Sequence, residues 1–442
     1  MKKYLPLLII SLLLITSCTT TVKSEKTYEQ TKNRILSGKL SEVDISEFED
    51  EYKDPVLYCI DSGVIDYYKG NYDTAIKSLD QADKEMESRI AKSKMEGIKT
   101  FLTNDLSREY GGEPYEVVFT NIFSALSYMQ LGNLDEALVE VKQSDIRLTD
   151  FQLNLKESDG ALTKTVFAIT PDPFKDFKEN YEGRPYNQSA TADYLSMITY
   201  RGLGDEGNAE VDMRRLQEKG IAIDPDDVSV PEGKARVNII SLNGLIGRKE
   251  GHEFESAHLF GSLEGYILLV PYKVSWPEMG KGICSVTSAR VDVSNGESFS
   301  LEMLENLTEN ARLNLNTSMR RNYLRSWYRG YTKIAALAVT RDAAIKGAQE
   351  SSNPLMRSGL IIGANAAFWG GVAGVNKVEV ADTRMGMYFP DNITFGGITL
   401  DPGKYDFTIT YRLSNGATFT VPYKGVEVKA GTVNLLTPQC AR

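Results

Sequence analysis

Histidine is nearly absent from this chain of 442 residues, which contains two, His252 and His258. A zinc-protease helix needs two histidines four residues apart, so that both face the metal. These two stand six apart, which places them on opposite faces of a helix or on one face of a strand. Glu253 and Glu255 lie nearby but would join a ligand set only through chance folding. The sequence therefore predicts no metal site.

The common catalytic and nucleotide-binding motifs are also missing. The chain has no Gly-x-Ser-x-Gly elbow, no Gly-Lys-Ser/Thr end of a P-loop and no dinucleotide-binding glycine spacing. Its 60 acidic residues do not single out a glycosidase pair, because such a pair is defined by distance in space. We predict neither a catalytic residue nor a cofactor.

An excess of basic residues is lacking as well, since 50 Lys and Arg stand against 60 Asp and Glu, a net charge of −10. Nucleic-acid binding depends on basic side chains that neutralise phosphates, so this balance argues against a nucleic-acid partner. Hydrophobic residues make up 42% and charged residues 25% of the chain, as in ordinary globular proteins. The length suffices for two or more domains.

Cysteine is scarce, and the first of the four, Cys18, is the most informative residue. Two lysines precede an apolar run from Leu5 to Ile15, and small residues lead into the cysteine. This order is typical of a secretory signal. A cysteine at the cut resembles the bacterial lipobox, which implies an acylated Cys18 that anchors the protein in a membrane. Thr19, in place of Asp, favours the outer membrane. The alternatives are an ordinary signal peptide with a chance cysteine, or an uncleaved anchor.

Three cysteines, Cys59, Cys284 and Cys440, follow the signal. An exported protein can form disulfides, but an odd number leaves at most one pair within the chain. Cys284 and Cys440 are the better candidates, because both lie in the half that has β character. The alternative is that all three are small buried apolar residues.

Three segments of the N-terminal half share one pattern when they are aligned on Gly70, Gly132 and Gly204. The glycine ends the first helix, where φ is often positive, and an alanine five residues later lets a second helix pack closely. The pattern resembles the tetratricopeptide repeat, a helix–turn–helix unit of 34 residues. The expected packing positions are Gly63, Gly70, Ala75, Ala125, Gly132, Ala137, Gly204 and Ala209.

The spacing of these glycines, 62 and 72 residues, departs from 34. We therefore expect a compact set of helical hairpins rather than a regular superhelix. Such hairpins provide surfaces rather than catalytic groups. They would act as a docking platform for a protein or peptide, or as a structural spacer.

The second half changes character after residues 223–234, which are acidic, contain Pro225 and Pro231, and suit a linker. Short β-rich runs follow, with Asn415-Gly416 as a strong hairpin signal. The sequence predicts an α+β fold. The expected division is a signal peptide at 1–17, a tether at 18–27, a helical domain at 28–222, the linker, and a mixed α/β domain at 235–442 that ends in strands.

A long helix is expected from Ser300 to Ala348, broken near Asn316–Ser318. Basic residues recur every four positions along it, on a face other than its apolar one. In an acidic protein this stripe would meet lipid phosphates or an acidic partner, or it would be a solvated face paired with local acids. The stripe consists of Arg321, Arg325, Arg329 and Lys333.

The stretch from Ser358 to Asn376 carries no charge over 19 residues. It is long enough to span a bilayer but is rich in Gly, Ala and Asn. We expect a buried helix with close neighbours, with a membrane-touching hairpin as the alternative.

A glycine-rich, basic turn follows the first β run, and its backbone amides could hold an anion, although a plain β-turn is the default. This candidate ligand turn consists of Asn243, Gly244, Gly247, Arg248 and Lys249. Together with residues 101–145, Arg341–Lys346 and Ala381–Arg384, the turn carries a resemblance to a family of tetratricopeptide-repeat-like bacterial cell-envelope lipoproteins.

The resemblance implies a lipoprotein without established enzymatic activity that associates with other envelope proteins. The function expected is that of a docking or assembly lipoprotein on the periplasmic side of the outer membrane. The alternatives are an envelope hydrolase acting on cell wall or glycan, and a surface-exposed ligand-binding lipoprotein.

Overall fold

The computed structural model describes residues 25–52, 54–96, 106, 108–167, 183–261 and 267–442. Cys18 and most of the expected tether lie outside these residues. The helical half begins with α2 (Glu25–Leu36). Three helical hairpins follow, formed by α3 (Pro55–Tyr68) and α4 (Tyr72–Glu96), α5 (Pro114–Gln130) and α6 (Leu134–Phe167), and α7 (Ala190–Gly202) and α8 (Glu206–Glu218).

Each hairpin turns where the sequence places its glycine. Gly70, Gly132 and Gly204 have φ values of 80°, 76° and 80°, a region that L side chains disfavour. Ala75, Ala137 and Ala209, five residues later, are fully buried, so the second helix packs closely on the first. The hairpin prediction thus agrees with the structure, and the α+β fold class is confirmed.

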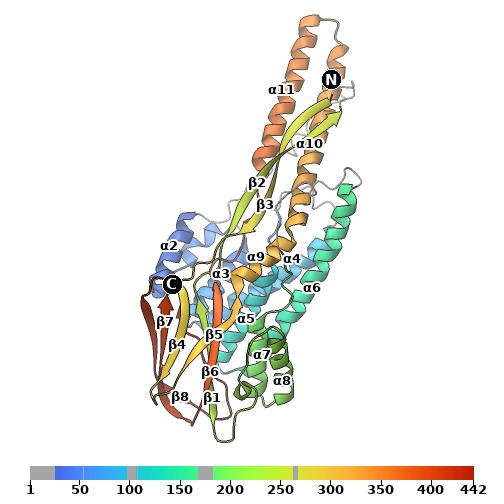
Figure 1. Cartoon of the computed structure of the whole chain (residues 1–442). Helices are drawn as coiled ribbons and strands as arrows, with labels where there is room; N and C mark the ends of the chain where they lie inside the picture. Colours follow the sequence, from blue (N-terminus) through green and yellow to red (C-terminus); the bar gives the residue numbers. More distant parts are fainter. Residues whose placement is uncertain (1–24, 53, 97–105, 107, 168–182, 262–266) are drawn as a thin grey trace.

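The second half is built on a curved sheet in the order β10–β1–β6–β5–β4–β7–β8, with β9 also beside β1 (Figure 1). β9 and β10 run parallel to β1, and the other pairs are antiparallel. The strands are β1 (Ala235–Asn243), β4 (Val286–Val293), β5 (Ser298–Asn306), β6 (Asn392–Leu400), β7 (Gly403–Leu413), β8 (Thr418–Val428), β9 (Asn434–Leu436) and β10 (Gln439–Cys440).

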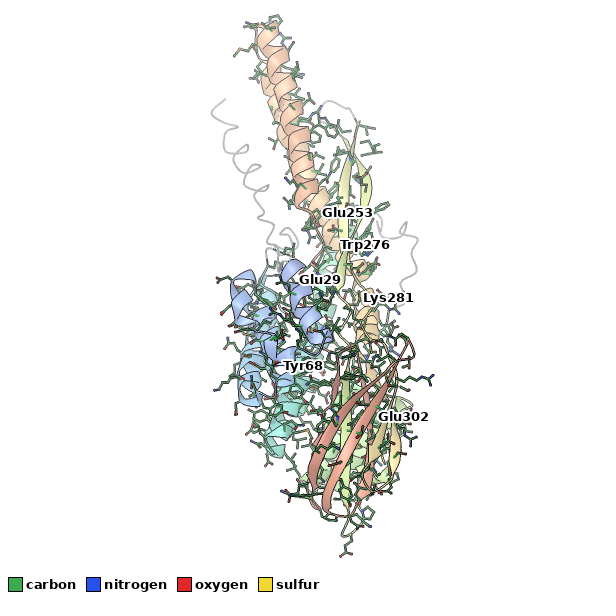
Figure 2. The ribbon with its side chains drawn as sticks, turned by 90° about the vertical axis from the view of Figure 1, so that its left-hand side faces the viewer. Glu29, Tyr68, Glu253, Trp276, Lys281 and Glu302 are labelled. Carbon is green, nitrogen blue, oxygen red and sulfur yellow. The ribbon has the colours of Figure 1, made fainter. Side chains whose placement is uncertain are left out.

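Two hairpins form an arm that projects from one end of this body (Figures 1 and 2). One is the antiparallel pair β2 (Lys249–Gly261) and β3 (Ile267–Met279). The other is helical and consists of α10 (Met319–Gln349) and α11 (Pro354–Val378). α9 (Leu307–Thr317) precedes α10. The expected helix break at Asn316–Ser318 is present, but residues 300–306 belong to strand β5, so the helix starts later than predicted.

The helical hairpins and the sheet share one hydrophobic core. The hairpins cover one face of the sheet through residues such as Tyr194, which packs edge-on against Phe395 of β6 at 4.8 Å between ring centroids. The opposite face of the sheet forms a second core around Val237, Val291 and Phe407. The expected linker is packed as well, because Asp227 is buried and accepts a 2.8 Å hydrogen bond from Arg236 Nε. The two halves therefore form one folding unit rather than two tethered domains.

Candidate functional site

The inner face of the helical hairpins is covered by the chain itself. The segment from Arg384 to Asn392, which leads from α11 into the first residue of β6, is buried along its length, and its central residues contact α3 and α5. The Gly386 amide donates to Glu116 Oε1 at 2.6 Å, and the Met387 amide donates to Asp61 Oδ1 at 2.7 Å. Residues 384–392 therefore cover the faces of α3 and α5 that carry Asp61 and Glu116.

Aromatic packing reinforces this contact. Phe389 lies between Phe119 and Phe123 of α5, at 6.0 and 5.8 Å between ring centroids, and Tyr68 donates from its hydroxyl to the Tyr388 carbonyl at 3.0 Å. Burial raises the pKa of Glu116 to about 7, although Lys249 nearby acts in the opposite direction. The buried acids on this face thus accept hydrogen bonds from the segment that covers them, which is a structural role.

A second buried acid, Glu305 of β5, links the start of α7 to the sheet through hydrogen bonds. It accepts hydrogen bonds from the Thr191 amide at 3.0 Å, from the Ser189 hydroxyl at 2.7 Å and from the Tyr186 hydroxyl at 2.8 Å. A carboxylate at a helix N-terminus satisfies amides that lack a partner within the helix and interacts favourably with the helix dipole.

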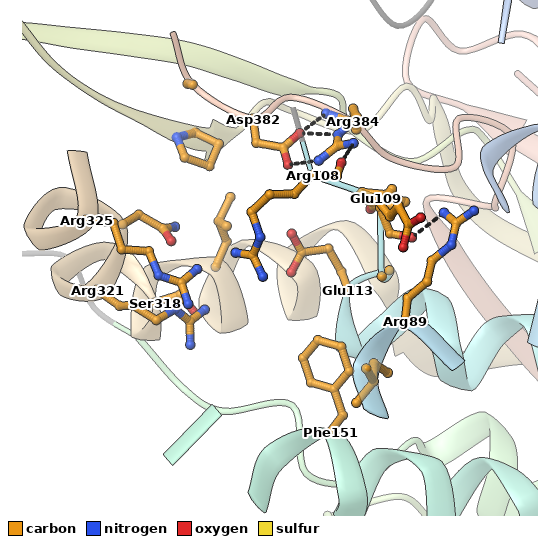
Figure 3. A pocket seen from close by; sticks show the side chains of 18 of the residues that line it. Arg89, Arg108, Glu109, Glu113, Phe151, Ser318, Arg321, Arg325, Asp382 and Arg384 are labelled. Atoms are coloured by element: carbon orange, nitrogen blue, oxygen red, sulfur yellow. Dashed lines mark hydrogen bonds and ion pairs between the residues drawn. The ribbon is translucent and has the colours of Figure 1, made fainter. Parts of the chain in front are cut away.

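A cavity of about 490 Å³ lies where the helical half meets the base of the arm. Figure 3 shows Arg108, Arg321 and Arg325 directed toward it, from two different parts of the chain. The carboxylates on its wall are engaged: Asp382 pairs with Arg384 at 2.8 Å, Glu109 pairs with Lys92 at 2.9 Å, and Glu113 pairs with Lys249. Guanidinium groups in such a setting suit an anion, and each carboxylate on the wall is already paired with a cation.

The predicted basic stripe is divided by the fold. Arg321 and Arg325 line this cavity, but Arg329 and Lys333 are buried. Arg329 pairs with Glu379, just after α11, at 2.6 Å. The stripe is therefore not a continuous surface for phosphates, and the expectation of a solvated face is wrong for its second half. Recurrence every four residues shows which side of a helix a residue occupies, not whether that side is buried.

The predicted ligand turn lies in the interior rather than in an open site. Asn243 donates to Asn392 and Thr394, both at 3.1 Å, and Gly247 packs so closely on the Gly280 carbonyl that a Cβ atom would come within 2.1 Å of it. The turn also includes Gly244, which packs against Ile283 and Cys284, Arg248, which lies over the Tyr28 ring, and Lys249, which is buried. Its glycines serve close backbone packing.

The residues predicted for repeat packing all lie in the helical hairpins. Ala125 is fully buried, like Ala75, Ala137 and Ala209. Gly63 faces Leu79 so closely that a Cβ atom would be 2.5 Å from Leu79 Cγ. The sequence pattern therefore placed these contacts correctly, although it did not show that residues 384–392 would fill the inner face.

The two histidines lie on strand β2, where a spacing of six puts them on one face. His252 Nε2 is 3.5 Å from Glu278, and His258 packs against aromatic rings of α10. Within the described residues, no cluster of His, Cys, Asp and Glu could hold a metal. Cys59, Cys284 and Cys440 are free thiols, so the Cys284–Cys440 disulfide considered from the sequence is not formed.

α11 differs most from expectation. We predicted a buried helix over Ser358–Asn376, but few of its residues are buried, namely Phe368, Gly371, Val372 and Val375. It packs mainly against α10 and, to a smaller extent, against β3. Within the described chain, α11 is also the one helix long and apolar enough to cross a membrane.

A row of exposed apolar residues on α6 was missed. Val139, Ile146 and Leu153 are 58%, 55% and 54% exposed, and each is seven residues from the next. A spacing of seven is two helical turns, so the three lie along one face. The heptad spacing was readable in the sequence, but the sequence did not show that this face would stay uncovered.

Comparison of the chain with protein-family models, with curated proteins and with solved structures gives no match. The family resemblance inferred from the sequence therefore stays a prediction. Function is inferred from geometry and sequence alone.

Proposed function

We propose that this chain is a lipid-anchored docking protein of the bacterial cell envelope. Acyl chains on Cys18 would hold it in the outer membrane on the periplasmic side, and its helical hairpins would bind a protein partner. The observation that carries this proposal is the row of Val139, Ile146 and Leu153 on α6. Three large apolar side chains that stay exposed in a row along one helix face offer a surface that another molecule could cover.

The geometry of the row favours a helical partner. Apolar residues that recur every seven positions form one stripe along a helix, which corresponds to one of the two apolar positions per heptad at which helices pack against each other. The inner face of the hairpins is occupied by residues 384–392, so docking would use the outer helix α6. We therefore expect the partner to present an amphipathic helix that lies along α6.

The hydrolase alternative gains no support from the cavity, because Glu109, Glu113 and Asp382 are each held by a cation. A surface-exposed ligand-binding role would use the arginines of that cavity. No contact in the structure favours it over docking.

Site-specific photocrosslinking in living cells tests the proposal. A photoreactive residue at position 146 should capture one envelope protein through a helical segment, whereas the same residue at position 362, where the native side chain is also exposed, should not capture it. Ile146→Asp should abolish that capture when the photoreactive residue stands at position 139. Capture that is independent of Ile146 would refute docking through α6.

The anchor is tested separately by acyl labelling. Metabolic labelling with a palmitate analogue should mark the parent chain but not the Cys18→Ala variant, whichever fraction the variant is found in. An unlabelled parent chain would refute lipidation.

A further inference from the structure

The outer part of the arm presents an apolar surface on two separate elements. On α11, Leu360 and Ile362 are 47% and 69% exposed, and Trp369 is also exposed. On the neighbouring strands, Leu259 of β2 and Leu269 of β3, which are cross-strand partners, are about as exposed. Monomeric soluble proteins seldom expose so many large apolar side chains together.

Charge disappears from both elements at the same level of the arm. On the exposed face of the β hairpin, Glu253, Glu255 and Lys273 lie nearer the body, and apolar residues lie beyond them. The Lys273 amide donates to Asn376 Oδ1 at 3.0 Å, which fixes the matching level on α11. From Asn376 outward, α11 carries no charge until Arg357 at its far end.

The length of this uncharged stretch matches a bilayer. From Asn376 to Ser358 an α-helix rises about 27 Å, close to the ~30 Å of a hydrocarbon core. The α10–α11 hairpin extends farther than the β2–β3 hairpin (Figure 1), so only helices, whose backbone hydrogen bonds are internal, reach the far end. Lys346, Glu350 and Arg357 gather near that end, where long side chains can reach headgroups.

Polar groups within the outer arm are partnered between the two helices. Arg341 of α10 donates to Asn365 of α11 at 2.8 Å and pairs with Asp342 at 2.9 Å, and both members of this ion pair are largely buried. Asn365 in turn donates to the Ile361 carbonyl at 2.9 Å. Ionisable residues inside membranes are typically paired and turned toward a neighbouring helix in this way.

We propose that the α10–α11 hairpin inserts its outer part, beyond Asn376, into a lipid bilayer, with the apolar end of the β2–β3 hairpin at the interface. The location of the lipid anchor, which belongs to the proposed function, points to the same membrane. Cys18 and Glu25 are seven positions apart, at most about 25 Å of extended chain. Glu29 lies at the end of the body from which the arm rises (Figure 2), and α11 alone is about 37 Å long. An arm longer than the tether, at the same end of the body, would reach a membrane in which Cys18 is anchored.

Vesicle flotation of the unlipidated chain, residues 19–442, tests insertion. Vesicles of phosphatidylethanolamine and phosphatidylglycerol should carry the protein upward in a density gradient. Ile362→Asp should reduce the bound fraction about 10-fold or more, because a carboxylate in hydrocarbon is strongly disfavoured. The matched control is Ile146→Asp, which introduces the same change on an exposed helix of the body and should leave flotation unchanged.

Trp369 provides a second readout, since Trp276 and Trp327, the other two tryptophans of the chain, are buried. Lipids brominated along their acyl chains should quench its fluorescence, and Trp369→Phe should remove the quenching. Absence of flotation and quenching would overturn the proposal. An equal loss of flotation in Ile362→Asp and Ile146→Asp would also overturn it. If Ile362→Asp altered only self-association or protein crosslinks, the apolar surface of the arm would instead bind a protein partner.

These outcomes are separable from those of the proposed function. The flotation assay uses no lipid on Cys18 and no partner, so insertion can fail while docking and anchoring hold. Conversely, absence of acyl label on Cys18 would refute the anchor, and a crosslink that is independent of Ile146 would refute docking through α6. Neither result would change the outcome of the flotation assay.

Discussion

Arg329 of α10 and Glu379, the residue that follows α11, form a 2.6 Å ion pair in which the side chains are 1% and 2% exposed. Ser326 adds a 2.8 Å hydrogen bond to the same carboxylate. The pair joins the two arm helices at the end where the arm meets the body. A buried charge without its partner is costly, so the base of the arm depends on both groups.

We expect Glu379→Ala to lower the free energy of unfolding by about 3 to 5 kcal/mol, because it leaves the Arg329 guanidinium buried without its partner carboxylate. Urea denaturation followed by circular dichroism measures the change. The control is the double variant Arg329→Met, Glu379→Leu, which removes both charges and should lose much less. Equal losses in the single and double variants would show that the ion pair is not the cause.

Glu305→Gln should destabilise the protein by about 2 kcal/mol. The amide that replaces one carboxylate oxygen would face donors, namely the hydroxyls of Tyr186, Ser189 and Thr191 and the Thr191 amide. Glu302→Gln on the same strand is the control, because Glu302 is exposed (Figure 2). Thermal melting of the two variants decides the matter, and similar melting temperatures would contradict a special role for Glu305.

Glu116 should contribute to the pH dependence of the free energy of unfolding. Its pKa is raised from 4.5 to about 7 in the folded protein, chiefly by burial, so the folded state binds the proton more tightly than the unfolded state does. The stabilisation is therefore complete below pH 4.5 and is lost as the pH rises through 7, at most about 3 kcal/mol. Denaturation at pH 5 and pH 8 should show a smaller difference in Glu116→Gln than in the parent protein or in the exposed control Glu136→Gln.

The three thiols should be slow to react in the folded state. Burial raises the pKa of Cys59 and of Cys440 to about 11 and also raises that of Cys284, so few thiolates exist near neutral pH. Labelling with a thiol-specific disulfide reagent at pH 7.5 should be slow in buffer and complete in urea. Rapid labelling of the folded protein would contradict this placement of the thiols.

The helical hairpins were predictable because their determinants are local. Gly70, Gly132 and Gly204 each adopt a backbone conformation that glycine favours, and an alanine follows at a fixed distance. The turn at Asn415-Gly416 between β7 and β8 is likewise encoded within a few residues, with Gly416 at a φ of 82°. Signals of this kind do not depend on the rest of the fold.

The errors concern contacts between distant parts of the chain. The partner of Arg329 lies 50 residues away, and the residues that cover Asp61 lie more than 320 away, so helical spacing could not reveal either. A long uncharged stretch such as residues 358–376 of α11 has the same composition whether protein, lipid or water surrounds it. The assignment of residues 300–306 failed because alternation in a short run is a weak signal beside a long helix.

Because residues 384–392 cover α3 and α5, the two helices are synthesised long before the residues that bury their inner faces. Translation delivers the helices first, and their inner surfaces stay bare until more than 250 further residues beyond α5 have emerged. During that interval apolar rings such as Phe119 and Phe123 are open to misassociation. A nascent chain of this kind would benefit from a chaperone until residues 384–392 have been made, and truncation ahead of residue 384 would yield an aggregation-prone fragment.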